Sequence, residues 1–250
     1  MKPTNETLEL LNRHVSVRQY LDKPVSDGQL AAIIEAGQMA STSSSVQAYT
    51  VIAVTDPALK AKLSALSGNQ AYIVQCPVFL VWCADLYRLR ESSAPHLQGA
   101  ESYEDTTENL IVATVDVALA AQNAAVAAES LGLGIVYIGG IRNHIAEVSG
   151  LLGLPELVYP VFGMCLGYPA GASGLRPRLP LEAVLHHNSY QAETTVEQVK
   201  VYDEITRDYM RERTGGQKDT PWSEMMAGRL AKPDRLHMKE FLLQKGFMQQ

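Results

Sequence analysis

Apolar residues recur with helical spacing in two segments near the N-terminus, residues 7–14 and 26–40. A short polar stretch, LDKP, separates them. In the second segment Ser26 is followed three residues later by Gln29, a spacing typical of a capping box at the start of a helix. The pattern therefore predicts a short helix, a loop and a longer, capped helix.

Strand-like and helix-like patterns alternate in the next part of the chain. Residues 49–56 form a β-branched run that ends at a turn, Asp56-Pro57, and a helix-like segment follows at 58–68. Residues 77–85, PVFLVWCAD, are almost continuously apolar, as in a strand that is covered on both faces. We therefore expect two strands joined by a helical connection.

A long helix is predicted from about residue 105 to 131, because this segment is rich in alanine and apolar on nearly all sides. Such a helix needs a large partner surface. Residues 133–140 and 159–169 have the pattern of buried strands, with a helix opened by Asn143 between them. The alternation predicts an α+β fold, an α/β sandwich in which helices cover the sheet.

The character of the sequence changes towards its C-terminal part. From residue 195 onward the chain is charged, helical in pattern and poor in strand-forming residues. We therefore expect a core over residues 1–194 and a helical extension over 195–250. The extension would pack on the core or on a second subunit.

Composition excludes several classes of function. Of the 250 residues, 46% are hydrophobic, which suits a compact domain, and the net charge of -6 includes no long basic run, so a nucleic-acid partner is not expected. The three cysteines have no zinc-site spacing, which favours reduced, buried thiols and no metal: Cys76, Cys83 and Cys165. No signal-peptide pattern is present and Asp116 interrupts the most apolar run, so we expect a cytoplasmic protein without a membrane span.

The stretch RHVSVRQY at residues 13–20 carries the first candidate chemistry. In an extended chain, His14, Ser16 and Arg18 would point to one face and the two intervening valines to the other. That polar face has the groups to hold an anion. A half-buried strand with an ordinary polar exterior explains the same alternation.

Three further stretches allow a binding or a structural interpretation. The serine patch at residues 41–47 is suited to a phosphate-binding turn or to a flexible linker. The RPR sequence at residues 176–178 is suited to a phosphate clamp or to a solvated basic loop. The paired glycines that end YIGG, residues 137–140, permit close approach to a flat ligand or a tight turn. The dinucleotide fingerprint GxGxxG, the P-loop and a hydrolase triad are absent from the sequence.

Taken in order, these segments resemble the nitroreductase superfamily. The match comprises HVSVR, the serine patch ending in Gln47, SGNQ at residues 67–70, GIVYIGGIRN at 134–143 and PRLP at 177–180. Over essentially its full length the chain is similar to the A-group, oxygen-insensitive NADPH nitroreductases and to NADPH-dependent FMN reductases. The resemblance implies a homodimer, a mixed and mainly antiparallel sheet covered by helices, bound FMN, and NADPH as co-substrate.

The resemblance also implies a role for each matching residue. Arg18 would stabilise charge beside flavin N1 and O2, no side-chain acid or base would be needed, and Arg213 would contact the 2′-phosphate of NADPH. The resemblance implies phosphate and ribityl contacts to FMN at His14 and Ser16, contacts across the subunit interface at Thr42 and Ser43, and a pyrimidine contact at Gln70. It also implies main-chain contacts near the ring at Gly139 and Gly140 and a phosphate clamp at Arg176 and Arg178. The further FMN-binding residues that we expect are Gln47, Tyr137 and Ile138.

Two positions depart from the family pattern, and the function has alternatives. Val15 stands where many A-group members have a second cation, and Arg176 where several have lysine. The implied activity is a ping-pong reaction in which NADPH reduces bound FMN, and the flavin then reduces nitroaromatics, quinones or free flavin. The alternatives are a flavin-binding or storage protein with little turnover, and an α/β enzyme that binds a phosphosugar or nucleotide without flavin.

Overall fold

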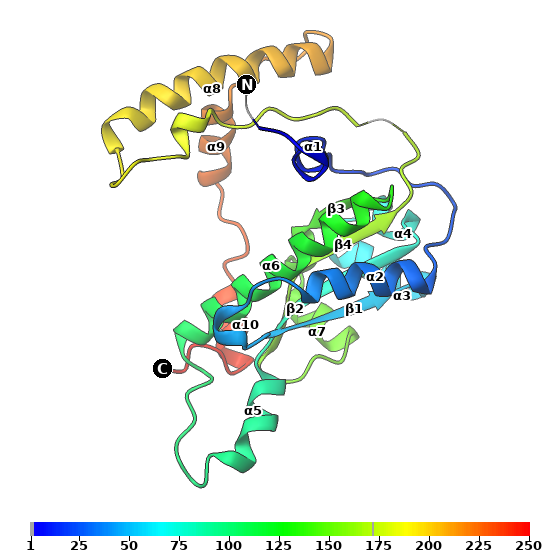
Figure 1. Cartoon of the computed structure of the whole chain (residues 1–250), viewed down its shortest axis with the longest axis vertical. Coiled ribbons are helices and arrows are strands. Elements are labelled where there is room, and N and C mark those ends of the chain that lie inside the picture. Colours follow the sequence, from blue (N-terminus) through cyan, green and yellow to red (C-terminus); the bar gives the residue numbers. More distant parts are fainter. Residues whose placement is uncertain (1–2, 172) are drawn as a thin grey trace. The chain divides into compact units, whose positions relative to one another are not determined.

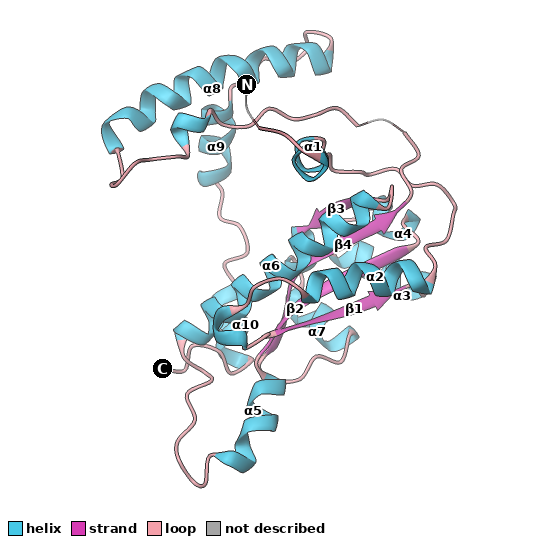
Figure 2. Cartoon of the chain, viewed as in Figure 1, coloured by secondary structure: helices cyan, strands magenta, loops and turns pink. Residues whose placement is uncertain are grey.

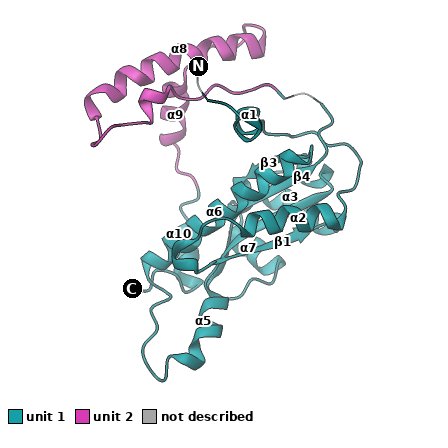
Figure 3. Cartoon of the chain, in the orientation of Figure 1, with its two compact units in different colours: residues 1–173, 235–250 teal, residues 174–234 magenta. Residues whose placement is uncertain are grey.

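The computed structural model describes residues 3–171 and 173–250, and the chain divides into two compact units. Unit 1 comprises Met1–Ser173 together with Arg235–Gln250, and unit 2 comprises Gly174–Asp234 (Figure 3). The sequence thus leaves unit 1, forms unit 2 and returns to unit 1. The expected boundary between residues 194 and 195 stays a prediction.

Unit 1 is built on a four-stranded sheet with the order β1-β2-β4-β3 (Figure 2). The strands are β1 (Tyr49–Val54), β2 (Val78–Asp85), β3 (Gly134–Ile138) and β4 (Val158–Gly167). The helices of unit 1 are α1 (Glu6–Asn12), α2 (Asp27–Gln38), α3 (Pro57–Leu66), α4 (Ala71–Gln75), α5 (Tyr87–Ser93), α6 (Thr107–Ser130), α7 (Ile145–Leu151) and α10 (Met238–Gln244), whereas α8 (Ala192–Thr214) and α9 (Trp222–Leu230) belong to unit 2 (Figure 1).

Every strand pairing within the described residues is antiparallel, so the expectation of a mixed sheet is wrong for this part of the chain. Alternating strands and helices usually indicate parallel strands joined by one crossover helix. Here two helices, α3 and α4, join β1 to β2. They return the chain to the end of the sheet that it left, because Val54 at the end of β1 pairs with Phe79 at the start of β2.

Strand β2 is covered on both faces, as its apolar run predicts. All eight of its residues are buried, and alternate side chains enter two different hydrophobic clusters. Leu80 and Trp82 pack in the cluster that contains α2 and α6, whereas Phe79 and Val81 pack in the cluster that contains α3, α4 and α7. The sheet therefore separates two cores, one on each face.

Local capping explains several helix boundaries. Ser26 and Gln29 form the expected capping box of α2, and Asp56 caps α3 with a proline in its first turn. The prediction that Asn143 opens α7 is wrong, because α7 begins at Ile145. The side-chain oxygen of Asn143, Oδ1, instead accepts a hydrogen bond from Arg235 Nε at 2.9 Å.

Helix α6 is the long alanine-rich helix expected from the sequence. Eight of its residues are buried, and the α2 helix and the sheet pack against it. Among the described residues it is the one helix long and apolar enough to span a membrane, yet it is a core helix of this fold. Its outer side nevertheless exposes an apolar stripe of Ile111, Val115 and Leu119.

Candidate active site

The segment of residues 14–18 runs in an extended conformation beside edge strand β3. The Val17 main-chain N–H donates to Ile135 O at 2.9 Å, and the Val17 side chain is buried. A Cβ at Gly134 would lie 2.4 Å from Val17 Cγ2, so the close approach of the two segments requires glycine there. Arg18, the next residue, is exposed, as the alternation predicts.

Val15 is less enclosed than the alternation suggests. It is only half-buried, and it lines an open pocket of about 270 Å³ together with Arg13, Val17 and Glu129. A residue at position 15 therefore meets a partly solvated space. Valine is therefore compatible with the fold at position 15, where many A-group members have a cation, although its side chain is not enclosed in the core.

Glu129, in the last turn of α6, is a partner of His14 that the sequence did not indicate. His14 Nδ1 lies 2.6 Å from Glu129 Oε1, and both side chains are mostly buried. Because a carboxylate accepts hydrogen bonds, Nδ1 carries the proton, and Nε2 is left for a ligand. The two residues are 115 positions apart, so no local pattern could have paired them.

The structure brings Gln70 together with the glycines that follow β3. Gly139 and Gly140 begin a 3-10 turn, Gly139–Arg142, and a Cβ at Gly140 would lie 2.4 Å from Ser67 O and 2.6 Å from Gln70 Nε2. Gln70 Nε2 donates to Ser67 O at 2.7 Å, and the Tyr72 hydroxyl donates to Gln70 Oε1. The Gln70 amide plane is thus fixed, with one N–H and one lone pair remaining for a ligand.

Tyr137 and Ile138 lead into this turn from the end of β3. The Tyr137 ring meets Phe162 edge-on at 5.0 Å, and burial raises the pKa of its hydroxyl, so the phenol stays neutral. The Ile138 side chain is 1% exposed and belongs to the cluster on the α3 face. Only the main chain of Ile138 is therefore available to a ligand, because its side chain is buried in the core.

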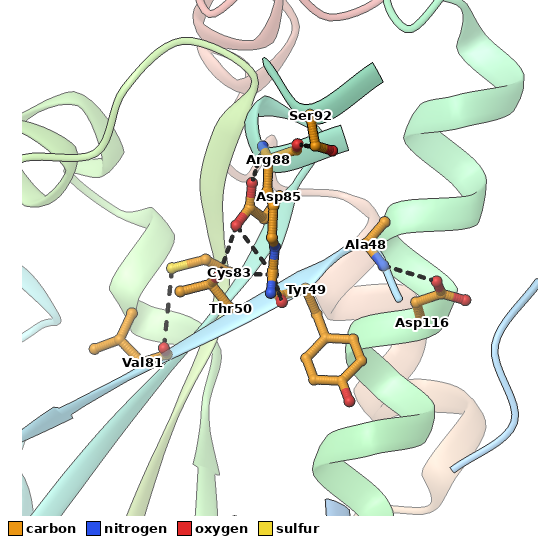
Figure 4. Close-up of polar contacts among 9 residues, drawn as sticks. All are labelled: Ala48, Tyr49, Thr50, Val81, Cys83, Asp85, Arg88, Ser92 and Asp116. Carbon is orange, nitrogen blue, oxygen red and sulfur yellow. Dashed lines mark hydrogen bonds and ion pairs between the residues drawn. The ribbon is translucent and has the colours of Figure 1, made fainter. Parts of the chain in front are cut away.

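The serine patch forms a short 3-10 turn, Ser43–Ser45, anchored on α6. Asp116 Oδ1 accepts the Ser43 N–H and Asp116 Oδ2 accepts the Ala48 N–H, each at 3.0 Å. Figure 4 shows the bond between Asp116 and Ala48. The patch that includes Thr42, Ser43 and Gln47 is therefore a built turn, as the phosphate-binding interpretation requires, and sequence reasoning missed the residue that holds it.

Three of the four arginines expected to contact cofactors, all except Arg18, lie in unit 2. Arg176 and Arg178 are exposed on a loop, and Arg178 NH1 donates to Arg176 O at 2.9 Å. Arg213 is in the last turn of α8, with its guanidinium 6.0 Å from the Tyr209 ring centre. Arg211, its neighbour two positions earlier, pairs with two carboxylates, those of Asp208 and Asp219.

Comparison with known proteins agrees with this architecture. The model of the nitroreductase family matches residues 11–168, and that of the nitroreductase family C-terminal domain matches residues 176–250. FMN reductase (NADPH) from Bacillus subtilis is 40% identical over 245 residues, 97% of this chain and 98% of that protein. Oxygen-insensitive NADPH nitroreductase from Salmonella typhimurium is 42% identical over 242 residues, with coverage of 96% and 98%.

Solved structures give the same result. Nitroreductase A from Vibrio parahaemolyticus superposes with a TM-score of 0.90 at 35% identity, over 99% of this chain and all of that chain. An NADPH:FMN oxidoreductase from Vibrio harveyi in complex with NAD+ superposes with a TM-score of 0.87 at 39% identity, over 98% of this chain and all of that chain. The fold and the matched residues thus define a reductase of the α+β class. The chain belongs to the nitroreductase family, among its NADPH-dependent FMN reductases and nitroreductases, as the sequence motifs predict.

The residues present fit FMN, the cofactor that this family implies. Exposed guanidinium and hydroxyl groups suit a phosphate and a ribityl chain, and Gly140 leaves no room for a side chain between the turn and Gln70. Next to that turn, the Ser67 hydroxyl is buried and has no hydrogen-bond partner among the described residues. A polar ligand group would satisfy such an atom.

Proposed function

We propose that the protein is an FMN-dependent oxidoreductase that uses NADPH to reduce nitroaromatics, quinones or free flavin by a ping-pong reaction. The observation that carries the proposal is the polar face of residues 14–18, held against β3 in a chain whose full-length relatives are named NADPH-dependent FMN reductase and nitroreductase. The name of the Vibrio harveyi relative, "NADPH-flavin oxidoreductase", supports the same choice of co-substrate.

Two groups of residues in unit 1 would contact FMN, and a phosphate clamp is assigned by the family resemblance alone. His14, Ser16 and Arg18 form the first group with Gln70 and the turn after β3. The second group is the serine turn with Thr42, Ser43 and Gln47, and the clamp is formed by Arg176 and Arg178. When bound, FMN would supply the chemistry that none of these side chains has, the transfer of a hydride.

Arg18 would act electrostatically. Its guanidinium is exposed and makes one long hydrogen bond, 3.5 Å from NH1 to Ser16 O, so N–H donors remain for a ligand. A fixed cation stabilises the negative charge that accumulates at flavin N1 and O2 on reduction. Side-chain general acids or bases are not needed for this role.

The preference for NADPH is assigned to Arg213. A guanidinium pairs well with the 2′-phosphate that NADH lacks. Arg213 donates a hydrogen bond to the Tyr209 hydroxyl, whereas Arg211 is already paired with two carboxylates. This difference supports Arg213 over its neighbour.

The active form is proposed to be a cytoplasmic homodimer. Ile111, Val115 and Leu119 are 53%, 47% and 43% exposed along one side of α6, and stripes of this kind are commonly covered by another protein surface. A second copy would cover this stripe and bring two serine turns into one assembly. The three cysteines are free and buried, in keeping with a reducing compartment.

The purified protein tests the proposal directly. It should be yellow, with flavin absorbance, and NADPH without oxygen should bleach that colour within the time of an enzyme assay. Absence of flavin would favour the phosphosugar or nucleotide enzyme, and flavin that is not bleached would favour the storage protein. Steady-state kinetics with nitroarenes, quinones and free flavin, under NADPH and under NADH, would then identify the acceptor.

The roles proposed for Arg18 and Arg178 predict different effects when each residue is replaced by alanine. Arg18→Ala should lower the rate of flavin reduction more than FMN affinity, because its charge matters most once the ring is reduced, whereas Arg178→Ala should chiefly release FMN. Stopped-flow reduction by NADPH and flavin retention on a desalting column measure the two effects. Equal flavin loss in both variants, with normal reduction of the retained fraction, would contradict the role given to Arg18.

A further inference from the structure

Asp116 is a buried carboxylate that the proposed reaction does not use. It lies in the middle of α6, its side chain is fully buried, and its neighbours on the buried side of the helix are Ala113, Val117 and Ala120. A carboxylate in such surroundings is unfavourable unless it is hydrogen-bonded. Its hydrogen bonds therefore show what the residue does.

Both oxygens of Asp116 bind the serine turn. Oδ1 accepts the main-chain N–H of Ser43 and Oδ2 that of Ala48, at 3.0 Å each. These two amides lie at opposite ends of the turn, 73 and 68 positions before Asp116 in the sequence. One side chain thus closes the turn and fixes it to the core helix.

The turn needs such an anchor because its backbone is strained. Ser44, Ser45 and Gln47 have positive φ angles of 47°, 58° and 53°, a conformation that side chains other than glycine adopt at a cost. Such residues persist only where surrounding contacts impose them. Within the turn itself, the Gln47 side chain donates from Nε2 to Ser45 O at 3.3 Å.

A second acidic residue fixes the chain on the far side of Ala48 (Figure 4). Asp85 N donates to Ala48 O at 3.0 Å, and Thr50 Oγ1 donates to Asp85 Oδ2 at 2.5 Å. Arg88 donates to Asp85 Oδ2 at 3.2 Å and also to Tyr49 O. The stem of the turn is therefore held at the end of β2, and among the described residues Asp116 supplies the side-chain hydrogen bonds that join the turn to α6.

We propose that Asp116 is a positioning residue for flavin binding: it holds the serine turn in its strained conformation so that the hydroxyls and amides of residues 42–47 present themselves to FMN. Asp116 touches no ligand itself. The inference rests on the proposed function, since that function makes the turn part of the FMN site. It adds a residue that none of the sequence motifs contains.

The test compares Asp116→Asn with Thr114→Val. The first variant keeps the shape of the side chain but places an NH2 group against the main-chain N–H of either Ser43 or Ala48, so one of the two hydrogen bonds is lost. The second removes a hydrogen bond of the same helix, 2.6 Å from Thr114 Oγ1 to the Tyr159 hydroxyl, without touching the turn. FMN dissociation constants are measured on the deflavinated, refolded proteins by quenching of flavin fluorescence.

We expect Asp116→Asn to raise the FMN dissociation constant by about 10- to 100-fold, the range for a lost hydrogen bond to a charged group. Thr114→Val should leave it within about threefold. Hydrogen exchange of the Ser43 and Ala48 amides, followed without FMN, should accelerate in Asp116→Asn alone. If Asp116→Asn does not fold, Asp116→Ser provides the same test, because its hydroxyl can bond the helix carbonyl one turn earlier.

Unchanged FMN affinity in a folded Asp116 variant, or an equal loss in Thr114→Val, would overturn the inference. So would unchanged exchange at the Ser43 and Ala48 amides. Failure of the proposed function gives a different result, because the wild-type protein itself would then either bind no FMN or bind FMN that NADPH does not bleach. The exchange measurement still tests the anchor in that case.

Discussion

Gly140→Ala tests whether the turn after β3 is as tightly packed against Gln70 as the structure indicates. The new Cβ would lie 2.4 Å from Ser67 O, 3.2 Å from Ser67 C and 2.6 Å from Gln70 Nε2. The Gln70 side chain can move, but the Ser67 carbonyl belongs to the main chain of a buried residue and cannot move cheaply. Overpacking of this kind costs about 1–3 kcal/mol, so the variant should unfold at lower denaturant concentration by that free energy.

Gly139→Ala is the matched control. It lies one position earlier in the same turn, yet its Cβ would meet only Arg142 NH2, at an ordinary contact distance of 3.5 Å. Equilibrium unfolding in urea, without added FMN, should show a loss of stability for Gly140→Ala and a change within about 0.5 kcal/mol for Gly139→Ala. With FMN added, Gly140→Ala should also bind the flavin less tightly, because Gln70 is displaced. Equal stability of the two variants would show that the turn relaxes freely and that the packing argument is wrong.

Three other measurements follow from the structure. Arg213→Ala should raise the Michaelis constant for NADPH by about one to two orders of magnitude and leave NADH unaffected, since a charge-assisted hydrogen bond contributes about 1.5–3 kcal/mol, whereas Arg211→Ala should change neither. Val115→Lys should convert a dimer into a monomer in sedimentation, and a persisting dimer would exclude the α6 stripe as the interface. Burial raises the pKa of the Tyr20 hydroxyl above its ordinary 10.0, so the folded protein favours the neutral phenol. The contribution of Tyr20 to the free energy of unfolding is therefore complete below about pH 10 and is lost as the pH rises further. Tyr20→Phe should reduce this loss of stability at alkaline pH, as measured by urea unfolding.

The sequence predicted those parts of the fold that are encoded by neighbours along the chain. The capping box of α2 depends on Ser26 and Gln29, the burial of β2 on one apolar run, and the length of α6 on its alanine-rich pattern. The antiparallel pairing of the strands was harder to predict from the sequence. It depends on two short helices returning the chain to the same end of the sheet, and the periodicity of a helix carries no information about its direction.

For the candidate site, the motifs indicated residues that face a ligand but not the residues that support them. Glu129 and Asp116 are both on α6, and their partners lie 115 and about 70 positions earlier in the sequence. Pairings at such separations have no local signal, and each acidic residue resembles an ordinary interruption of an apolar helix. Asn143 is the converse case: its local signal predicted a helix start, but α7 begins at Ile145 and the Asn143 side chain bonds the distant Arg235 instead.

The return of the chain to unit 1 after unit 2 has a consequence for the order in which the protein folds during synthesis. Phe241 and Phe247 are buried in the same cluster as α6, Phe247 meets the Tyr159 ring edge-on at 5.2 Å, and Leu157 N donates to Lys245 O at 2.7 Å. A ribosome makes these residues only after all of unit 2. The cluster on that face of the sheet therefore cannot close while the chain is still being extended through residues 174–234, and a nascent chain arrested there should expose the apolar surface of unit 1 to chaperones.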